Sequence, residues 1–120
     1  MNRPSYTQAV ALEYGKNKTP VVTAKGDDEL AQRIVEEAQK LRPDIILLDI
    51  SMPLLNGLDA ARQIRKLVPE CKLIMLTMHA TPTYAAEAFK AGVSGYLIKR
   101  SAASELKQAI QAVRQGQHYM

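Results

Sequence analysis

The sequence predicts a single α/β domain, residues 1–120, with a mostly parallel five-stranded sheet as the middle of three layers. The strongest signal is Ile45–Leu48, four consecutive apolar residues ended by Asp49, which is typical of a strand buried on both faces. From Asp44 onward, strand and helix patterns alternate, which implies right-handed crossovers and parallel strands. Before that point the chain predicts an antiparallel β-hairpin in place of the first strand–helix unit.

The hairpin prediction depends on two short strands and the turn between them. Thr7–Tyr14 has an alternating pattern, and Pro20–Lys25 follows it after a turn too short for a parallel crossover. Numbering the strands along the chain, we expect the order 2-1-3-4-5, with Thr7–Tyr14 central because it is the more apolar segment. The alternative order is 1-2-3-4-5. Pairing of Val22 or Ala24 with the third strand would establish it.

The remaining elements follow from hydrophobic periodicity and from helix-end signals. The acidic run Asp27–Glu29 opens a helix that Pro43 ends. Gly92 is the expected C-cap of a later helix. After the strand Ile45–Asp49, helices are expected at about Leu58–Leu67, Pro82–Ala91 and Ser101–Gln115, and strands at Leu73–Met78 and Gly95–Lys99.

The composition is that of a soluble cytoplasmic domain, with 47% hydrophobic and 23% charged residues. Cys71 is the only cysteine, which excludes an internal disulfide and a Cys-based zinc site. No apolar run approaches the roughly 20 residues of a membrane helix, so we expect no membrane partner. The net charge of +4 comes from scattered basic residues without interleaved aromatics, so we expect no nucleic-acid partner.

Polar residues at the ends of three successive buried strands form the candidate site. Asp49, Thr77 and Lys99 are expected to converge at the carboxyl edge of the sheet, where α/β proteins build their sites. A carboxylate, a hydroxyl and an ammonium can accept, orient and neutralise a phosphoryl group, with the carboxylate as nucleophile. Asp, Thr and Lys also end strands without any chemical role, and this alternative remains open on spacing alone.

Asp44–Gln117 resembles the receiver domain of bacterial response regulators, in the subgroup that precedes a LuxR-type DNA-binding domain. The matching stretches are PDIILLDISMPLLNGLDAARQIR, LIMLTMHATPTYAAEAFKAGVSGYLIK and SAASELKQAIQAVRQG. The resemblance implies a flavodoxin-like fold and an Mg²⁺ cofactor. It implies Asp49 as phosphoacceptor, Thr77 and Tyr96 as switch residues, and Lys99 as the lysine that pairs with the phosphate.

Residues Ala9–Lys40 are instead similar to the cytoplasmic domain of the export-gate switch protein of flagellar and type III secretion systems. A receiver opens with a strand that ends in two acids and then a helix, whereas a hairpin is expected here. This change suggests a chimera, with an export-gate-like part at 1–42 and a receiver-like part at 43–120. The Asn-Pro-Thr-His motif at which that family cleaves itself is absent, so autocleavage is not expected.

The changed opening puts the metal site in question. Mg²⁺ prefers several oxygen ligands in near-octahedral geometry, and Asp49 alone is a poor site. Asp27 and Asp28 follow the second predicted strand at the correct edge of the sheet. They could replace the missing acids only if that strand lies directly beside Ile45–Asp49, and otherwise they serve as helix N-caps.

Three functions are compatible with these observations. The main interpretation is an engineered or recombined chimera without evolved or enzymatic activity, which needs no cofactor and carries Asp49 as a vestigial phosphoacceptor. The alternatives are a receiver domain phosphorylated on Asp49 by a histidine kinase with Mg²⁺, and a secretion-gate interaction module. No helix-turn-helix segment follows Gln117, so we expect no DNA-binding output. Ser101–Gln115 would cover its sheet face alone, which favours an isologous homodimer across the uncovered part.

Overall fold

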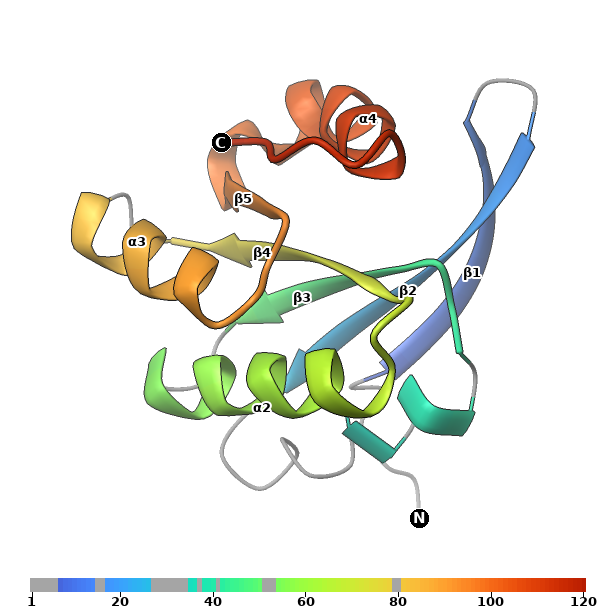
Figure 1. The fold of residues 1–120 in the computed structure, drawn as a ribbon. Helices are drawn as coiled ribbons and strands as arrows, with labels where there is room; N and C mark the ends of the chain where they lie inside the picture. The colour runs from blue at the N-terminus through green and yellow to red at the C-terminus, as the bar shows by residue number, and fades with distance from the viewer. Residues whose placement is uncertain are drawn as a thin grey trace, which may run out of the picture.

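The computed structural model describes the backbone of residues 7–14, 17–26, 35, 36, 38–40, 42–50, 54–78 and 81–120. It describes the side chains of residues 35, 36, 38–40, 42–48, 57–78 and 81–120. In chain order the elements are β1 (Thr7–Tyr14), β2 (Asn17–Gly26), β3 (Ile45–Ile50), α2 (Leu54–Leu67), β4 (Lys72–Thr77), α3 (Pro82–Lys90), β5 (Gly95–Ile98) and α4 (Lys99–Arg114) (Figure 1). Residues 35, 36 and 38–40 are also helical.

The strands form one sheet in the order β1-β2-β3-β4-β5. β2, β3, β4 and β5 are parallel, and β1 runs antiparallel to β2 at the edge. The predicted parallel α/β architecture is therefore confirmed. Val22 pairs with Ile46 and Ala24 with Leu48, so the predicted order 2-1-3-4-5 with Thr7–Tyr14 in the centre is wrong. Both orders give β2 and β3 the same direction, and they differ in which strands pair. Direct pairing of β2 with β3 keeps four neighbouring strands parallel, whereas a central β1 would place an antiparallel strand between them.

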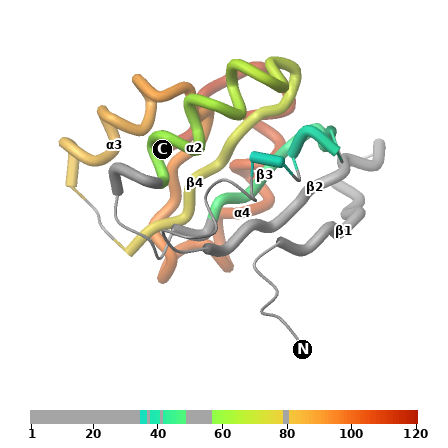
Figure 2. The backbone as a smooth tube through the Cα atoms, turned by 90° about the horizontal axis from the view of Figure 1, so that it is seen from below, coloured from blue at the N-terminus to red at the C-terminus, as the bar shows by residue number. Residues whose placement is uncertain are grey.

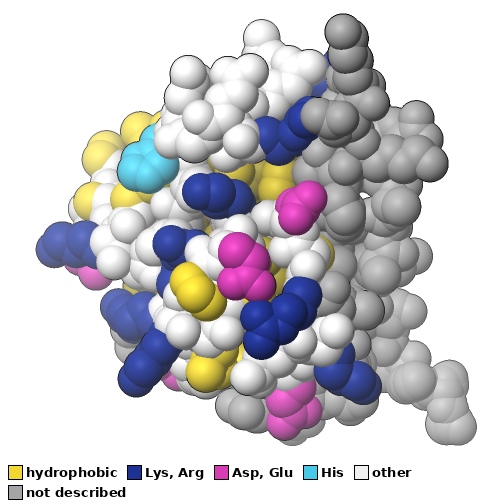
Figure 3. All heavy atoms as spheres, turned by 45° about the vertical axis from the view of Figure 1, so that its right-hand side comes forward, with side chains coloured by type: hydrophobic (Ala, Val, Ile, Leu, Met, Phe, Trp, Pro, Cys, Tyr) yellow, Lys and Arg dark blue, Asp and Glu magenta, His cyan; other side chains and the backbone are white. Residues whose placement is uncertain are grey.

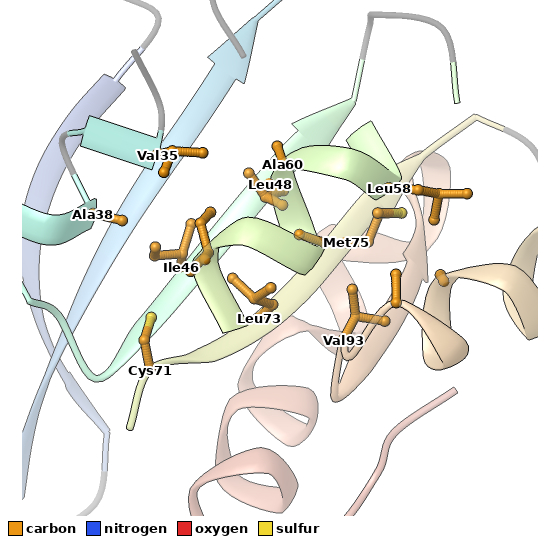
Figure 4. Close-up of a cluster of buried hydrophobic side chains, with 14 of the residues drawn as sticks. Val35, Ala38, Ile46, Leu48, Leu58, Ala60, Cys71, Leu73, Met75 and Val93 are labelled. Atoms are coloured by element: carbon orange, nitrogen blue, oxygen red, sulfur yellow. The ribbon is translucent and has the colours of Figure 1, made fainter. Parts of the chain in front are cut away.

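β3 is buried on both faces because its side chains alternate between two apolar clusters. Ile46 and Leu48 belong to the cluster beneath α2, and Figure 4 shows Leu48 beside Ala60 of that helix. Ile45 and Leu47 belong to the cluster on the opposite face, beneath α4. Since neither face meets water, the strand needs no alternation of polar and apolar residues, which confirms the interpretation of this run from the sequence.

Helices cover the sheet on both sides, with α2 and α3 on one face and α4 on the other (Figure 1). α2 and α3 lie next to each other, as the view from below in Figure 2 shows. α4 packs its buried stripe of Ala109, Ile110 and Val113 against β4 and β5. Among the described helices, α4 is alone on its face of the sheet.

Several element boundaries differ from the predicted ones. α2 begins at Leu54 rather than near Leu58, and β4 ends at Thr77 rather than Met78. β5 ends at Ile98, and Lys99 is already the first residue of α4. The predicted start at Ser101 is late because Ile98 takes the N-cap position with extended backbone and no side-chain cap. A cap of that kind leaves no signal in the sequence.

Candidate functional site

The carboxyl ends of β3, β4 and β5 lie at one edge of the sheet, because these strands are parallel neighbours. In the register, Asp49 stands beside Leu76, and Thr77 stands beside Ile98. Lys99 follows Ile98 directly, at the junction of β5 and α4. The structure thus places the three predicted site positions at neighbouring strand ends. For Asp49 this placement concerns the backbone, since its side chain lies outside the described set.

Thr77 is the one buried polar residue among the described side chains, with 3% of its surface exposed. It is the last residue of β4 and follows a strand that is almost entirely buried. A buried hydroxyl is unfavourable unless it is hydrogen-bonded, so the fold holds this group in a defined place at the sheet edge. That position suits a hydroxyl that orients a ligand at the edge.

A cavity of about 300 Å³ opens at the same edge, lined by Met78, Ile98, Lys99 and Arg100. The cations of Lys99 and Arg100 come from the first turn of α4. Two cationic side chains beside a cavity raise the local concentration of anions. Two cationic side chains therefore border the edge of the sheet at which the candidate site residues lie.

Tyr96 lies in β5 and is buried on the side of the sheet covered by α2 and α3. Burial raises the pKa of its phenol, and the nearby Tyr84 raises that pKa further. Tyr96 therefore stays neutral at physiological pH. It lines a second cavity of about 330 Å³, which is bordered by α3, β5 and α4.

The predicted metal site depends on how the ends of β2 and β3 are arranged. Asp27 and Asp28 lie outside the described residues. β2 nevertheless lies directly beside β3, and its last residue Gly26 stands beside Ile50 at the same edge. This arrangement meets the condition under which the two acids could serve Asp49, since adjacent strands lie about 4.8 Å apart. Within the described side chains, no group of three His, Cys, Asp or Glu could hold a metal ion.

The path of the last residues, which was not predicted from the sequence, brings them close to this site. Tyr119 forms a parallel β-bridge with Gly95, and Met120 lines the same cavity as Tyr96. In Figure 1 the chain accordingly ends close to β5 and α4. The signal that could have found it is Gly116, a helix-ending glycine with φ of +84°, followed by aromatic and apolar residues.

The surface charge agrees with the scattered pattern in the sequence. On the face shown in Figure 3, Lys and Arg side chains are dispersed, and Asp and Glu side chains lie between them. In the described ranges, no helix has both the length and the apolar character needed to cross a membrane.

Known proteins resemble the chain along most of its length. The family model of the response regulator receiver domain matches residues 7–111. The transcriptional regulatory protein DegU of Brevibacillus brevis is 38% identical over 82% of the chain and 41% of the relative. The transcriptional regulatory protein DesR of Bacillus subtilis (strain 168) is 42% identical over 76% of the chain and 45% of the relative. The chain therefore spans less than half the length of these two relatives.

A solved structure agrees with these relatives. The crystal structure of a LuxR-family two-component response regulator from Aurantimonas sp. SI85-9A1 is 34% identical and has a TM-score of 0.70. The match covers 80% of this chain and 66% of that chain. Because the relatives include transcriptional regulators, the expectation that the protein has no nucleic-acid partner is not supported.

These findings overturn the main functional interpretation of the sequence. The family match covers both sides of residue 42, so the interpretation as a chimera without evolved activity is wrong. The assignment of Ala9–Lys40 to the export-gate family is likewise without support. β2 was predicted as part of a foreign hairpin. In the structure it runs parallel to β3, as a strand of a receiver-like sheet does. The chain belongs to the family of response-regulator receiver domains.

Proposed function

We propose that residues 1–120 form one receiver domain, which accepts a phosphoryl group on Asp49. The observation that carries this proposal is the position of Asp49, Thr77 and Lys99 at neighbouring ends of β3, β4 and β5 in a chain of this family. The positions of Lys99 and Arg100 beside a cavity at the same edge support it, because two cations attract an anionic donor.

The chemistry follows from the three side chains. A carboxylate oxygen of Asp49 attacks the phosphorus of the donor, and the bond between phosphorus and the leaving group breaks. The leaving group takes the bonding electron pair, and the product is an aspartyl-phosphate. The Lys99 ammonium pairs with the phosphoryl charge, and the Thr77 hydroxyl donates a hydrogen bond to a phosphoryl oxygen. The domain is a phosphoacceptor rather than an enzyme, since its own Asp49 is the group that is modified.

We further propose that Asp27, Asp28 and Asp49 hold Mg²⁺. β2 lies beside β3, in the place expected for the first strand of a receiver, and Asp27 and Asp28 directly follow its last residue in the sequence. Carboxylates from two adjacent strand ends form an oxygen-rich donor set of the kind that Mg²⁺ prefers. When bound, the metal neutralises the charge that develops on the phosphoryl oxygens. The β1–β2 hairpin would then replace the first strand–helix unit of the family while it keeps the acids in place.

The family and the relatives of the chain indicate two kinds of partner. We propose that a histidine kinase is the phosphoryl donor and that the domain acts in the cytoplasm. Because DegU and DesR are transcriptional regulators, we propose that phosphorylation of this domain controls transcription. The matched region is less than half of each relative, so DNA contact is not assigned to any residue of this chain.

Incubation with acetyl phosphate and Mg²⁺, followed by intact mass spectrometry, tests the proposal. We expect the mass of one phosphoryl group to be added to the wild-type chain and to be absent in Asp49→Asn. Asp27→Asn and Asp28→Asn should require a higher Mg²⁺ concentration. Asp59→Asn, an exposed position on α2, is the matched control and should behave as wild type. Equal Mg²⁺ dependence in all variants would remove the acid pair from the metal site.

A further inference from the structure

The segment Gln117–Met120, here called the C-terminal strap, lies along the outer edge of the sheet. β5 is an edge strand, and two backbone groups are bonded on its side away from β4: the carbonyl of Ser94, the residue just before β5, and the N–H of Tyr96. The Ser94 N–H instead bonds the Leu73 carbonyl of β4. The Tyr119 N–H donates a hydrogen bond of 2.9 Å to the Ser94 carbonyl. The Tyr96 N–H donates one of 3.0 Å to the Tyr119 carbonyl. The strap therefore continues the parallel sheet by a single bridge, at Gly95.

Side chains of the strap contact the helices on both sides of β5. The Tyr119 hydroxyl donates a hydrogen bond of 3.0 Å to Oε1 of Glu105 on α4. The His118 ring lies with its centroid 5.3 Å from that of Phe89 on α3. Met120 borders the cavity of about 330 Å³ beside Tyr96. The strap thus joins α3, β5 and α4.

The turn before the strap directs it to this edge. α4 ends at Arg114, and the Gly116 N–H donates to the Val113 carbonyl at 3.0 Å. The Gln117 N–H donates to the Ala112 carbonyl, also at 3.0 Å. The positive φ of Gly116 reverses the chain there. Local geometry therefore returns the chain toward β5 rather than letting it continue along the axis of α4.

We propose that the strap is a built-in occupant of the β5 edge, which keeps a second copy of this chain from pairing there. An edge strand with open N–H and C=O groups is a template for strand pairing, and proteins protect such edges. At β5, the strap bonds the outward groups of Ser94 and Tyr96. A second copy is the partner that an open β5 edge fits, since two identical edges can pair antiparallel about a two-fold axis. This role does not depend on phosphorylation of Asp49.

Tyr119→Pro tests the docking of the strap, because proline lacks both the N–H that bonds Ser94 and the hydroxyl that bonds Glu105. Hydrogen exchange by NMR should show the Tyr96 amide protected in the wild-type chain and exchanging at least about tenfold faster in the variant. The Leu97 amide faces β4 and should keep its protection, which shows that the fold is intact. Tyr119→Phe is the matched control, since it keeps both backbone bonds and should leave Tyr96 protected.

Sedimentation over a range of concentrations tests the second part of the proposal. Tyr119→Pro should shift toward larger species with rising concentration, relative to the wild-type chain and Tyr119→Phe, and its Tyr96 amide should regain protection in them. Equal exchange of the Tyr96 amide in wild type and Tyr119→Pro, at a concentration where sedimentation shows no association of the variant, would overturn the docking of the strap. An exposed Tyr96 amide in a variant that associates no more than wild type would overturn its role in preventing pairing.

Discussion

At the residue scale, the sequence predicted the positions of the candidate site better than their surroundings. Asp49, Thr77 and Lys99 could be predicted because a buried run followed by a polar residue marks the end of a strand. Parallel neighbours then bring such ends together without further information. The burial of Tyr96 and its cavity could not be predicted, since they depend on how α3 and α4 pack around β5.

Cys71 carries a residue-scale prediction about reactivity. Its thiol is fully buried, and desolvation raises its pKa to about 12. A thiol reagent should therefore modify the native chain at pH 8 only as fast as it unfolds, because the thiolate is the reactive form. As a control, the unfolded chain in denaturant should be modified rapidly, and rapid modification of the native chain would contradict the burial of the thiol.

The raised pKa also makes stability depend on pH. Between about pH 8.5 and 12 the folded chain keeps the Cys71 proton that the unfolded chain loses, so the free energy of unfolding falls as pH rises through this range.

At the element scale, the strand order shows where sequence patterns stop being informative. Apolar content suggested Thr7–Tyr14 as a central strand, yet β1 pairs only with β2 at the edge. Local composition predicts how deeply a strand is buried, whereas strand order depends on which strands pair across the whole sheet. Both candidate orders give β2 and β3 the same direction, and the pairing of β2 with β3 decides between them.

The turn after α3 carries an element-scale prediction. Gly92 has φ of +107°, and a Cβ there would lie 2.6 Å from Cγ of Arg65. Arg65 cannot easily move, because its Nη1 donates hydrogen bonds to the Pro69 carbonyl at 2.7 Å and to the Cys71 carbonyl at 2.9 Å. Gly92→Ala should destabilise the chain by about 1 kcal/mol or more beyond Gly116→Ala, where φ is also positive and no atom lies near. Chemical denaturation measures the free energy of unfolding of both variants. An equal loss of stability in the two variants would show that the contact with Arg65 does not contribute.

At the scale of the whole molecule, the unusual N-terminal hairpin is no sign of foreign origin, because the receiver family matches residues 7–111. The predicted hairpin removed the first strand–helix unit, and the acids seemed lost with it. β2 lies beside β3 in the sheet, so Asp27 and Asp28 follow a strand with the right direction at the right edge. The condition that the sequence set for these two acids, a second strand directly beside the third, is therefore met, and their role at the metal stays a prediction.

The isologous homodimer stays a prediction at this scale. α4 is alone on its face among the described helices, and a single helix covers only part of a five-stranded sheet. Large exposed apolar areas are rare in monomers, so two chains are expected to pair across the rest of that face. Light scattering over a range of concentrations should give the mass of a dimer. A monomeric mass at high concentration, without binding of a hydrophobic dye, would show that one chain covers its own face.

The central claim is that Asp49 accepts a phosphoryl group, and locating that group on the chain tests it most directly. After treatment with acetyl phosphate and Mg²⁺, trapping of the acyl phosphate by reduction and peptide mass analysis should place the modification at Asp49. Removal of Mg²⁺ should abolish it. An unmodified chain at saturating donor and Mg²⁺, or the same modification in Asp49→Asn, would contradict the claim.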